Sequence, residues 1–114
     1  MFKVKMGVIQ YTYIISSLFL ITGFADAGNW QVSWESEKGA AISRCAKIFE
    51  DYQLQAVCMD NERKGYDKMQ GSFGLPNTEA KKAKIRCART FADFQLQAIC
   101  MQNEKDGYDK MRKY

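Results

Sequence analysis

The chain has 114 residues, with 17 Lys and Arg side chains against 13 Asp and Glu, four Cys, one Pro and no His. The absence of His excludes Ser-His and Cys-His nucleophilic catalysis and removes the commonest protein ligand of metal ions. The net charge of +4 is modest and the two signs alternate along the chain, which argues against a nucleic-acid-binding function.

The first 27 residues have the pattern of a secretory signal peptide. Two lysines form a basic start, residues 8–24 are mostly apolar, and Ala25-Asp26-Ala27 matches an A-x-A cleavage site. A retained membrane anchor is the alternative, but the apolar run is shorter than the ~20 residues that a spanning helix needs. We therefore predict cleavage after Ala27 and an exported protein of residues 28–114, secreted or periplasmic, that touches the membrane only during export.

Residues 44–69 and 86–111 are two copies of one segment. They align without a gap at a constant offset of 42 positions, and 18 of the 26 aligned pairs are identical. Half of the other eight pairs are conservative, such as Tyr52 with Phe94. Such self-similarity is typical of one supersecondary unit used twice. We therefore predict that residues 28–114 form a single small domain built of two repeats.

Each copy is predicted to be a pair of helices rather than one long helix. The composition favours helix, because Pro occurs once and Val and Thr are few. Asp51 and Asp93 are good N-cap residues, and each is followed by an aromatic residue and the helix-favouring run Gln-Leu-Gln-Ala. A turn at each Asp would give two tandem helical hairpins, with about four helices in an all-α fold.

The four cysteines are predicted to form two disulfides, as is usual in short exported proteins. Cys45 and Cys58 are 13 residues apart, as are Cys87 and Cys100, so on one straight helix their sulfurs would lie about 20 Å apart. Because a turn brings each pair to the same level of a hairpin, we favour Cys45–Cys58 with Cys87–Cys100. The cross-repeat pairing Cys45–Cys100 with Cys58–Cys87 would instead suit two long helices. The parallel pairing, Cys45–Cys87 with Cys58–Cys100, needs a long return crossing.

The second half of each repeat carries apolar side chains at helical spacing, with a Gly on the same stripe. The recurrence of this Gly, as Gly65 and Gly107, suggests either a close helix crossing or a helix end. Residues 70–76 form a turn-rich linker, after which Thr78 is expected to start the next helix.

The repeat resembles a loosely defined group of small exported bacterial proteins. The resemblance covers about half of the chain and rests on Cys45, Phe49, Asp51, Tyr52, Leu54, Cys58, Gly65 and Met69, and on their counterparts 42 positions later. In that group the residues before the Asp often form a turn, which agrees with the hairpin, although this chain has no Pro or Gly there. The group implies no activity.

The Cys-x12-Cys helical unit is also similar to exported lysozyme-inhibitor domains. Their Asp-x-x-Leu-Asn-x-x-Tyr ending is replaced here by Tyr-Asp-Lys-Met at residues 66–69. This second resemblance implies inhibition of a cell-wall hydrolase as an alternative function.

Catalytic and cofactor sites find little support in the sequence. No Cys-x-x-Cys pair, haem-attachment motif or Gly-rich phosphate loop occurs. The carboxylates shared by both copies lie among Lys and Arg, which favours solvated ion pairs over acid–base chemistry. Cys58-Met59 and Cys100-Met101 would suit Cu(I), although disulfides with Met filling the core explain them better. We expect no enzymatic activity, no cofactor and no resident metal.

The polar positions shared by both copies are the best candidate for a binding surface, because packing alone does not require them to match. The predicted surface has tyrosine anchors and glutamines, at Tyr66, Tyr108, Gln53 and Gln95. Trp30 and Trp34 precede the repeats, and they either cover an open end of the hairpin pair or add to this surface. A recent duplication would also explain the match. We therefore predict a disulfide-stabilised exported protein that binds a protein partner or has a structural accessory role.

Overall fold

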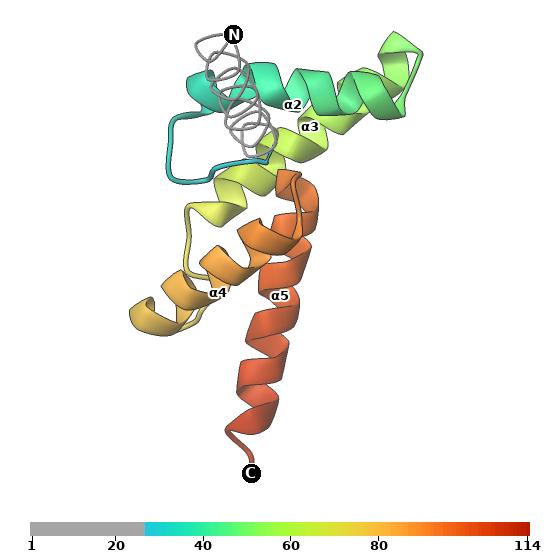
Figure 1. Cartoon of the computed structure of the whole chain (residues 1–114). Helices are drawn as coiled ribbons and strands as arrows, with labels where there is room; N and C mark the ends of the chain where they lie inside the picture. Colours follow the sequence, from blue (N-terminus) through green and yellow to red (C-terminus); the bar gives the residue numbers. More distant parts are fainter. Residues whose placement is uncertain (1–26) are drawn as a thin grey trace, which may run out of the picture.

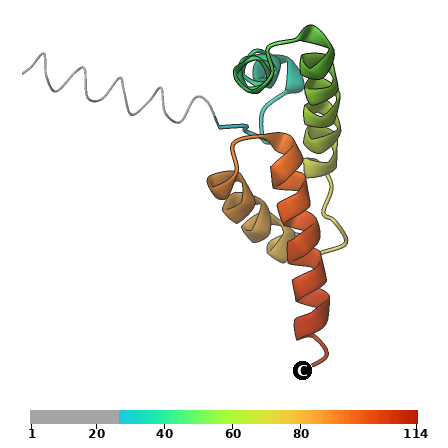
Figure 2. The same cartoon turned by 90° about the vertical axis from the view of Figure 1, so that its right-hand side faces the viewer.

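The computed structural model describes residues 27–114, and within them the chain is all-helical. The helices are α2 (Trp34–Ile48), α3 (Tyr52–Met69), α4 (Asn77–Thr90) and α5 (Phe94–Met111). Helix α2 packs against α3 and α4 against α5, so the chain forms the two predicted tandem hairpins (Figure 1). Helices α3 and α5 also pack against each other and join the hairpins (Figure 2).

The predicted signal peptide lies outside the described residues, apart from Ala27. Within the described part, no helix is both long enough and apolar enough to span a bilayer.

The hairpin turns form where the sequence places an Asp. Asp51 and Asp93 have extended backbone, and each carboxylate accepts a 2.7 Å hydrogen bond from the N–H three residues later. This bond satisfies one of the amides that have no intrahelical partner in the first turn of a helix. The preceding helix ends in both hairpins at an extended Phe, Phe49 or Phe91. The chain therefore reverses direction without Pro or Gly.

Each hairpin is closed by its own disulfide, Cys45–Cys58 in the first and Cys87–Cys100 in the second. The paired Cα atoms lie 5.8 and 5.7 Å apart, which is a normal separation for a disulfide. The favoured within-repeat connectivity is confirmed, and both cross-repeat pairings are excluded. Two intramolecular disulfides are typical of proteins in an oxidising extracellular compartment.

The buried core lies in the second hairpin and against the end of α3. Its side chains are small or flexible, and they are Met69, Leu75, Ala80, Ala83, Cys87 and Met101. The linker contributes to it, because Phe73 and Gly74 have positive φ angles of 57° and 81° and turn the chain so that Leu75 points inward. Helix α4 starts at Asn77, one residue before the predicted start. A core of this kind is small, so the two disulfides must supply much of the stability.

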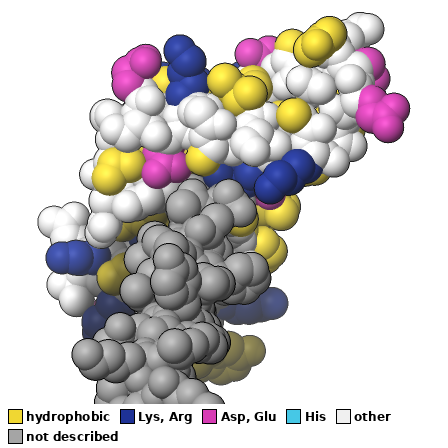
Figure 3. Space-filling view, turned by 45° about the horizontal axis from the view of Figure 1, so that its top comes forward, with side chains coloured by type: hydrophobic (Ala, Val, Ile, Leu, Met, Phe, Trp, Pro, Cys, Tyr) yellow, Lys and Arg dark blue, Asp and Glu magenta, His cyan; other side chains and the backbone are white. Residues whose placement is uncertain are grey.

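The outer face of α2 carries a mixture of side-chain types. Figure 3 shows acidic, basic and hydrophobic side chains interspersed on this face rather than gathered by kind. Ile42 of α2, for example, is about half exposed. Single exposed apolar side chains are normal on protein surfaces. A functional site is therefore better sought where several of them share one hollow.

Candidate functional site

The two hairpins meet at a joint, where the start of α5 packs on the middle of α3. Phe94, the first residue of α5, is fully buried, and its ring centroid lies 5.2 Å from that of Tyr66 and 6.3 Å from that of Trp34. Gly65 makes this approach possible, because a Cβ atom there would overlap the Phe94 carbonyl and lie 2.7 Å from the nitrogen of Gln95. Gly65 therefore marks a close crossing, one of the two explanations that the sequence left open.

A buried ion pair completes the joint. The Glu62 carboxylate, in a residue only 2% exposed, accepts hydrogen bonds from Arg44 Nη2 at 2.9 Å and from the Phe94 N–H at 3.1 Å. The first N–H of a helix has no intrahelical acceptor, so Glu62 satisfies the start of α5 as well as pairing with Arg44. The Arg44 guanidinium also lies 5.5 Å from the centroid of the Phe94 ring. One network thus links α2, α3 and α5.

The segment before α2 is tied to the same joint. The Gly28 N–H donates to the Ala92 carbonyl at 2.6 Å, and the Gly28 carbonyl accepts from Gln97 Nε2 at 3.0 Å. The Tyr66 hydroxyl donates to the Val32 carbonyl at 2.6 Å. The residues that follow the predicted cleavage site therefore contribute to the structure that holds the hairpins together.

Replacing Gly65 by Ala is expected to lower the free energy of unfolding by about 2 kcal/mol, because the added methyl group would force α5 away from α3. Its counterpart Gly107 has no atom within 4 Å of an added Cβ, so Gly107→Ala should instead stabilise the helix by about 1 kcal/mol. Urea unfolding of the two variants compares these effects directly. If both substitutions raised the free energy of unfolding, or both lowered it, the close helix crossing would not distinguish Gly65 from Gly107.

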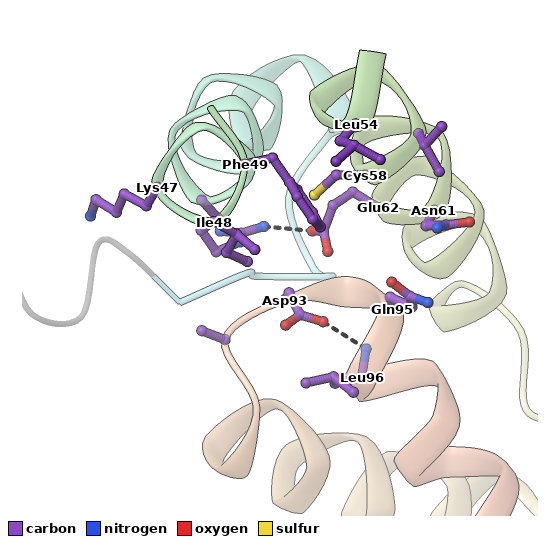
Figure 4. Close-up of a pocket in the computed structure, with 13 residues that line it drawn as sticks. Lys47, Ile48, Phe49, Leu54, Cys58, Asn61, Glu62, Asp93, Gln95 and Leu96 are labelled. Carbon is purple, nitrogen blue, oxygen red and sulfur yellow. Dashed lines mark hydrogen bonds and ion pairs between the residues drawn. The ribbon is translucent and has the colours of Figure 1, made fainter. Parts of the chain in front are cut away.

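A groove runs along one side of the joint and is the candidate functional site. Its volume is about 540 Å³, which lies in the range of ligand pockets. One wall comes from the end of α2 and from α3, and the other comes from the turn before α5 and its first residues (Figure 4). The apolar lining consists of Ile48, Phe49, Leu54, Val57 and Leu96, with Ala92.

Four of these apolar side chains are large and yet exposed. Their exposed fractions are 64% for Ile48, 52% for Val57, 45% for Leu54 and 42% for Leu96. Lys47, Asp93 and the Arg44–Glu62 pair add charged groups to the walls. An apolar hollow edged by polar groups is typical of a site that binds another molecule.

The structure corrects the prediction that Tyr66 is a surface anchor. Tyr66 is 8% exposed and its ring packs against Trp34, with centroids 5.5 Å apart. It is buried because α5 and the segment before α2 both cover this face of α3. Trp34 is half-buried beside it, with the Arg63 guanidinium 5.1 Å from its ring centroid. Trp34 therefore packs against the joint between the hairpins.

The other predicted surface residues lie apart from one another. Tyr108, the counterpart of Tyr66, is half-buried, and the Arg112 guanidinium lies 5.7 Å from its ring centroid. Gln53 and Gln95 are exposed in the first turns of α3 and α5, and Gln95 lines the groove. Trp30 packs against the core of the second hairpin. Of the six predicted residues, Gln95 is thus the one that reaches the groove.

Trp30 also covers a buried cation. The Lys84 ammonium lies 4.6 Å from the Trp30 ring centroid, and Lys84 is almost fully buried. Burial lowers the pKa of Lys84, because removal from water disfavours the charged form of an amine. The face of the indole ring offsets part of that penalty. Lys84 and Trp30 are therefore best explained as parts of the second hairpin's packing.

The apolar lining of the groove was missed as a site in the sequence. Leu54, Val57 and Leu96 fall on the helical stripe, which indicates a buried face. Helical spacing shows that a face is apolar but not whether another part of the chain covers it. One sequence signal could have pointed to the site. Apolar side chains stand on both sides of the first turn, at Ile48 and Phe49 before the Asp51 N-cap and at Leu54 after it.

No group of three or more His, Cys, Asp or Glu side chains is placed to hold a metal ion in the described residues. The four cysteine sulfurs form disulfides, so they do not offer the thiolates that Cu(I) prefers. Comparisons with protein-family models, with curated proteins and with solved structures find no match to this chain. A function is therefore inferred from its own residues and their geometry.

Proposed function

We propose that this protein is exported and acts without catalysis, as a binding protein or structural accessory, and that the groove receives apolar side chains of a protein partner. The observation that carries the proposal is the gathering of Ile48, Leu54, Val57 and Leu96 in one hollow while each stays exposed. Covering them would remove apolar surface from water, which is favourable by about 25 cal/mol per Å².

Export is supported by two independent features. The first 27 residues have the order of a cleavable signal peptide, and each hairpin contains a disulfide of the kind that an oxidising compartment maintains. Cleavage after Ala27 would make Gly28 the first residue. Its nitrogen lies 2.6 Å from the Ala92 carbonyl, so the new amino terminus would remain tied to the joint.

The apolar character of the groove is tested with the fluorescent probe anilinonaphthalene sulfonate. The native protein is expected to bind it, and Leu96→Asp is expected to weaken that binding tenfold or more, because a charge would stand in the apolar wall. Ile85→Asp on α4 is the matched control, since Ile85 and Leu96 are both 42% exposed and Ile85 lies outside the groove. If the two substitutions weakened binding of the probe equally, the groove would not be its binding site.

The protein partner is tested by photo-cross-linking in cells that export the chain. A benzophenone side chain at Val57, inside the groove, is expected to give a discrete adduct with another protein, and Leu96→Asp on the opposite wall should abolish it. The same side chain at Ile42 on α2, which is 47% exposed against 52% for Val57, serves as the control. An adduct that persists with Leu96→Asp, or that forms as well from Ile42, would count against this function.

A further inference from the structure

The two repeats differ most in what covers one face of their second helix. In α3 this face consists of Glu62, Gly65, Tyr66 and Met69, and we call it the first socket. Its counterparts in α5, which we call the second socket, are Glu104, Gly107, Tyr108 and Met111. The first socket is covered by the second hairpin, so that Met69 is 0% exposed, whereas Met111 is 69% exposed. A groove of about 510 Å³ lies over the second socket.

The residue that fills the first socket also has an exposed counterpart. Phe94, the first residue of α5, is 0% exposed, whereas Tyr52, the first residue of α3, is 85% exposed. Both follow an Asp N-cap with the same geometry, so the backbone presents the two rings in the same way. In the described residues, Phe94 therefore fills the first socket. Its equivalent in the first hairpin, Tyr52, is exposed, and the second socket, in the second hairpin, is open.

We propose that the second socket of one molecule receives Tyr52 of another copy, so that molecules associate head to tail through the contact that joins the hairpins within each chain. Such an interface uses different surfaces on its two sides, so association continues into open chains or closes into rings.

The second socket is already arranged for this contact. Arg86 Nη2 holds the Glu104 carboxylate at 2.8 Å, as Arg44 holds Glu62 at 2.9 Å. In the first socket that carboxylate also accepts the N–H of Phe94. The N–H of Tyr52 stands at the same position of a helix, where no intrahelical acceptor exists. The exposed Gly107 leaves room for the close approach that Gly65 allows in the first socket.

Two groups of the internal joint do not recur at the second socket. The counterpart of Trp34 is Pro76, so the indole ring is not repeated. The counterpart of Gly28 is Gln70, whose N–H already donates to the Asp67 carbonyl, so the amino-terminal tie is not repeated either. The Arg86–Glu104 pair is also more exposed than its counterpart. Association between molecules is therefore expected to be weaker than the internal joint and to depend on protein concentration.

Sedimentation velocity of the oxidised protein, expressed from its full sequence, tests the proposal from about 10 μM to about 1 mM. The average mass is expected to rise with concentration, and both Tyr52→Ala and Gly107→Ala should keep the protein monomeric. Gly39→Ala is the matched control, because Gly39 of α2 is also an exposed helical glycine with nothing within 4 Å of an added Cβ. It should raise the Tm as Gly107→Ala does, yet leave association intact.

Mixing the two variants distinguishes head-to-tail contact from a symmetric dimer. Tyr52→Ala keeps an open second socket and Gly107→Ala keeps an exposed Tyr52, so together they should form a one-to-one complex and nothing larger. A wild-type protein that stays monomeric over the whole range would overturn the proposal. So would association that survives both substitutions, or variants that fail to combine. Neither position lines the groove of the proposed function, so that function can hold or fail independently.

Discussion

Replacing Cys87 and Cys100 together by Ala is expected to lower the free energy of unfolding by about 3 kcal/mol or more. Closing a loop of this length restricts the unfolded chain by about that amount, and a small domain has only about 5 kcal/mol of stability to lose. Cys87 is also fully buried in the core cluster, so its loss removes packing as well. Urea unfolding followed by circular dichroism measures the change.

The corresponding change in the first hairpin is the natural control. Cys45–Cys58 spans the same 13 residues, so the effect on the unfolded chain should be the same. Cys45 is as fully buried as Cys87, so the packing lost should also be similar and the two double replacements should cost about the same. A loss below about 1 kcal/mol for both pairs would show that the hairpins do not depend on their disulfides.

Substituting Glu62 by Gln is the second change with a large expected effect, a loss of about 3 kcal/mol. The substitution keeps the shape of the side chain but removes the carboxylate charge from an ion pair whose side chains are only 11% and 3% exposed. It also weakens the acceptor for the N–H of Phe94 at the start of α5. Thermal or urea unfolding measures the loss.

Glu104→Gln makes the same chemical change at the equivalent position of the second repeat. The Arg86 and Glu104 side chains are 55% and 35% exposed, so water screens the pair and the loss should stay below about 1 kcal/mol. Equal losses for the two substitutions would mean that the joint does not exclude water from Glu62.

The local features of the fold could be predicted because each depends on a few neighbouring residues. Asp51 and Asp93 cap helices wherever an aromatic residue and a helix-favouring run follow them. The spacing of Cys45 and Cys58 allows a disulfide only if the chain turns between them. The prediction of the turn and the prediction of the disulfide therefore support each other.

The difference between the two copies could not be predicted, because the residues concerned are the same in both. Glu62 and Glu104 share one sequence context, as do Gly65 and Gly107, yet the first of each pair is buried and the second is not. What decides their burial is tertiary: the start of α5 covers this face of α3, whereas Gly107 and Met111 on the equivalent face of α5 are exposed in the described part of the chain. The prediction for Tyr66 failed for this reason.

The groove escaped prediction for a related physical reason. Leu54 and Leu96 are equivalent residues in the first turns of α3 and α5. They lie on opposite walls of the groove. Apolar spacing marks both as an interior face. Only the crossing of α3 and α5 determines that this face remains open.

The central claim is that the protein is exported and that each of its two hairpins is closed by its own disulfide. Peptide mapping of the exported protein, without reduction, tests this claim most directly. Trypsin places Cys45 and Cys87 in three-residue peptides and leaves Cys58 and Cys100 in residues 48–63 and 90–105, so each pairing gives its own mass. We predict a chain beginning at Gly28, with Cys45 linked to Cys58 and Cys87 to Cys100. Links between the repeats, free thiols or a retained leader would contradict it.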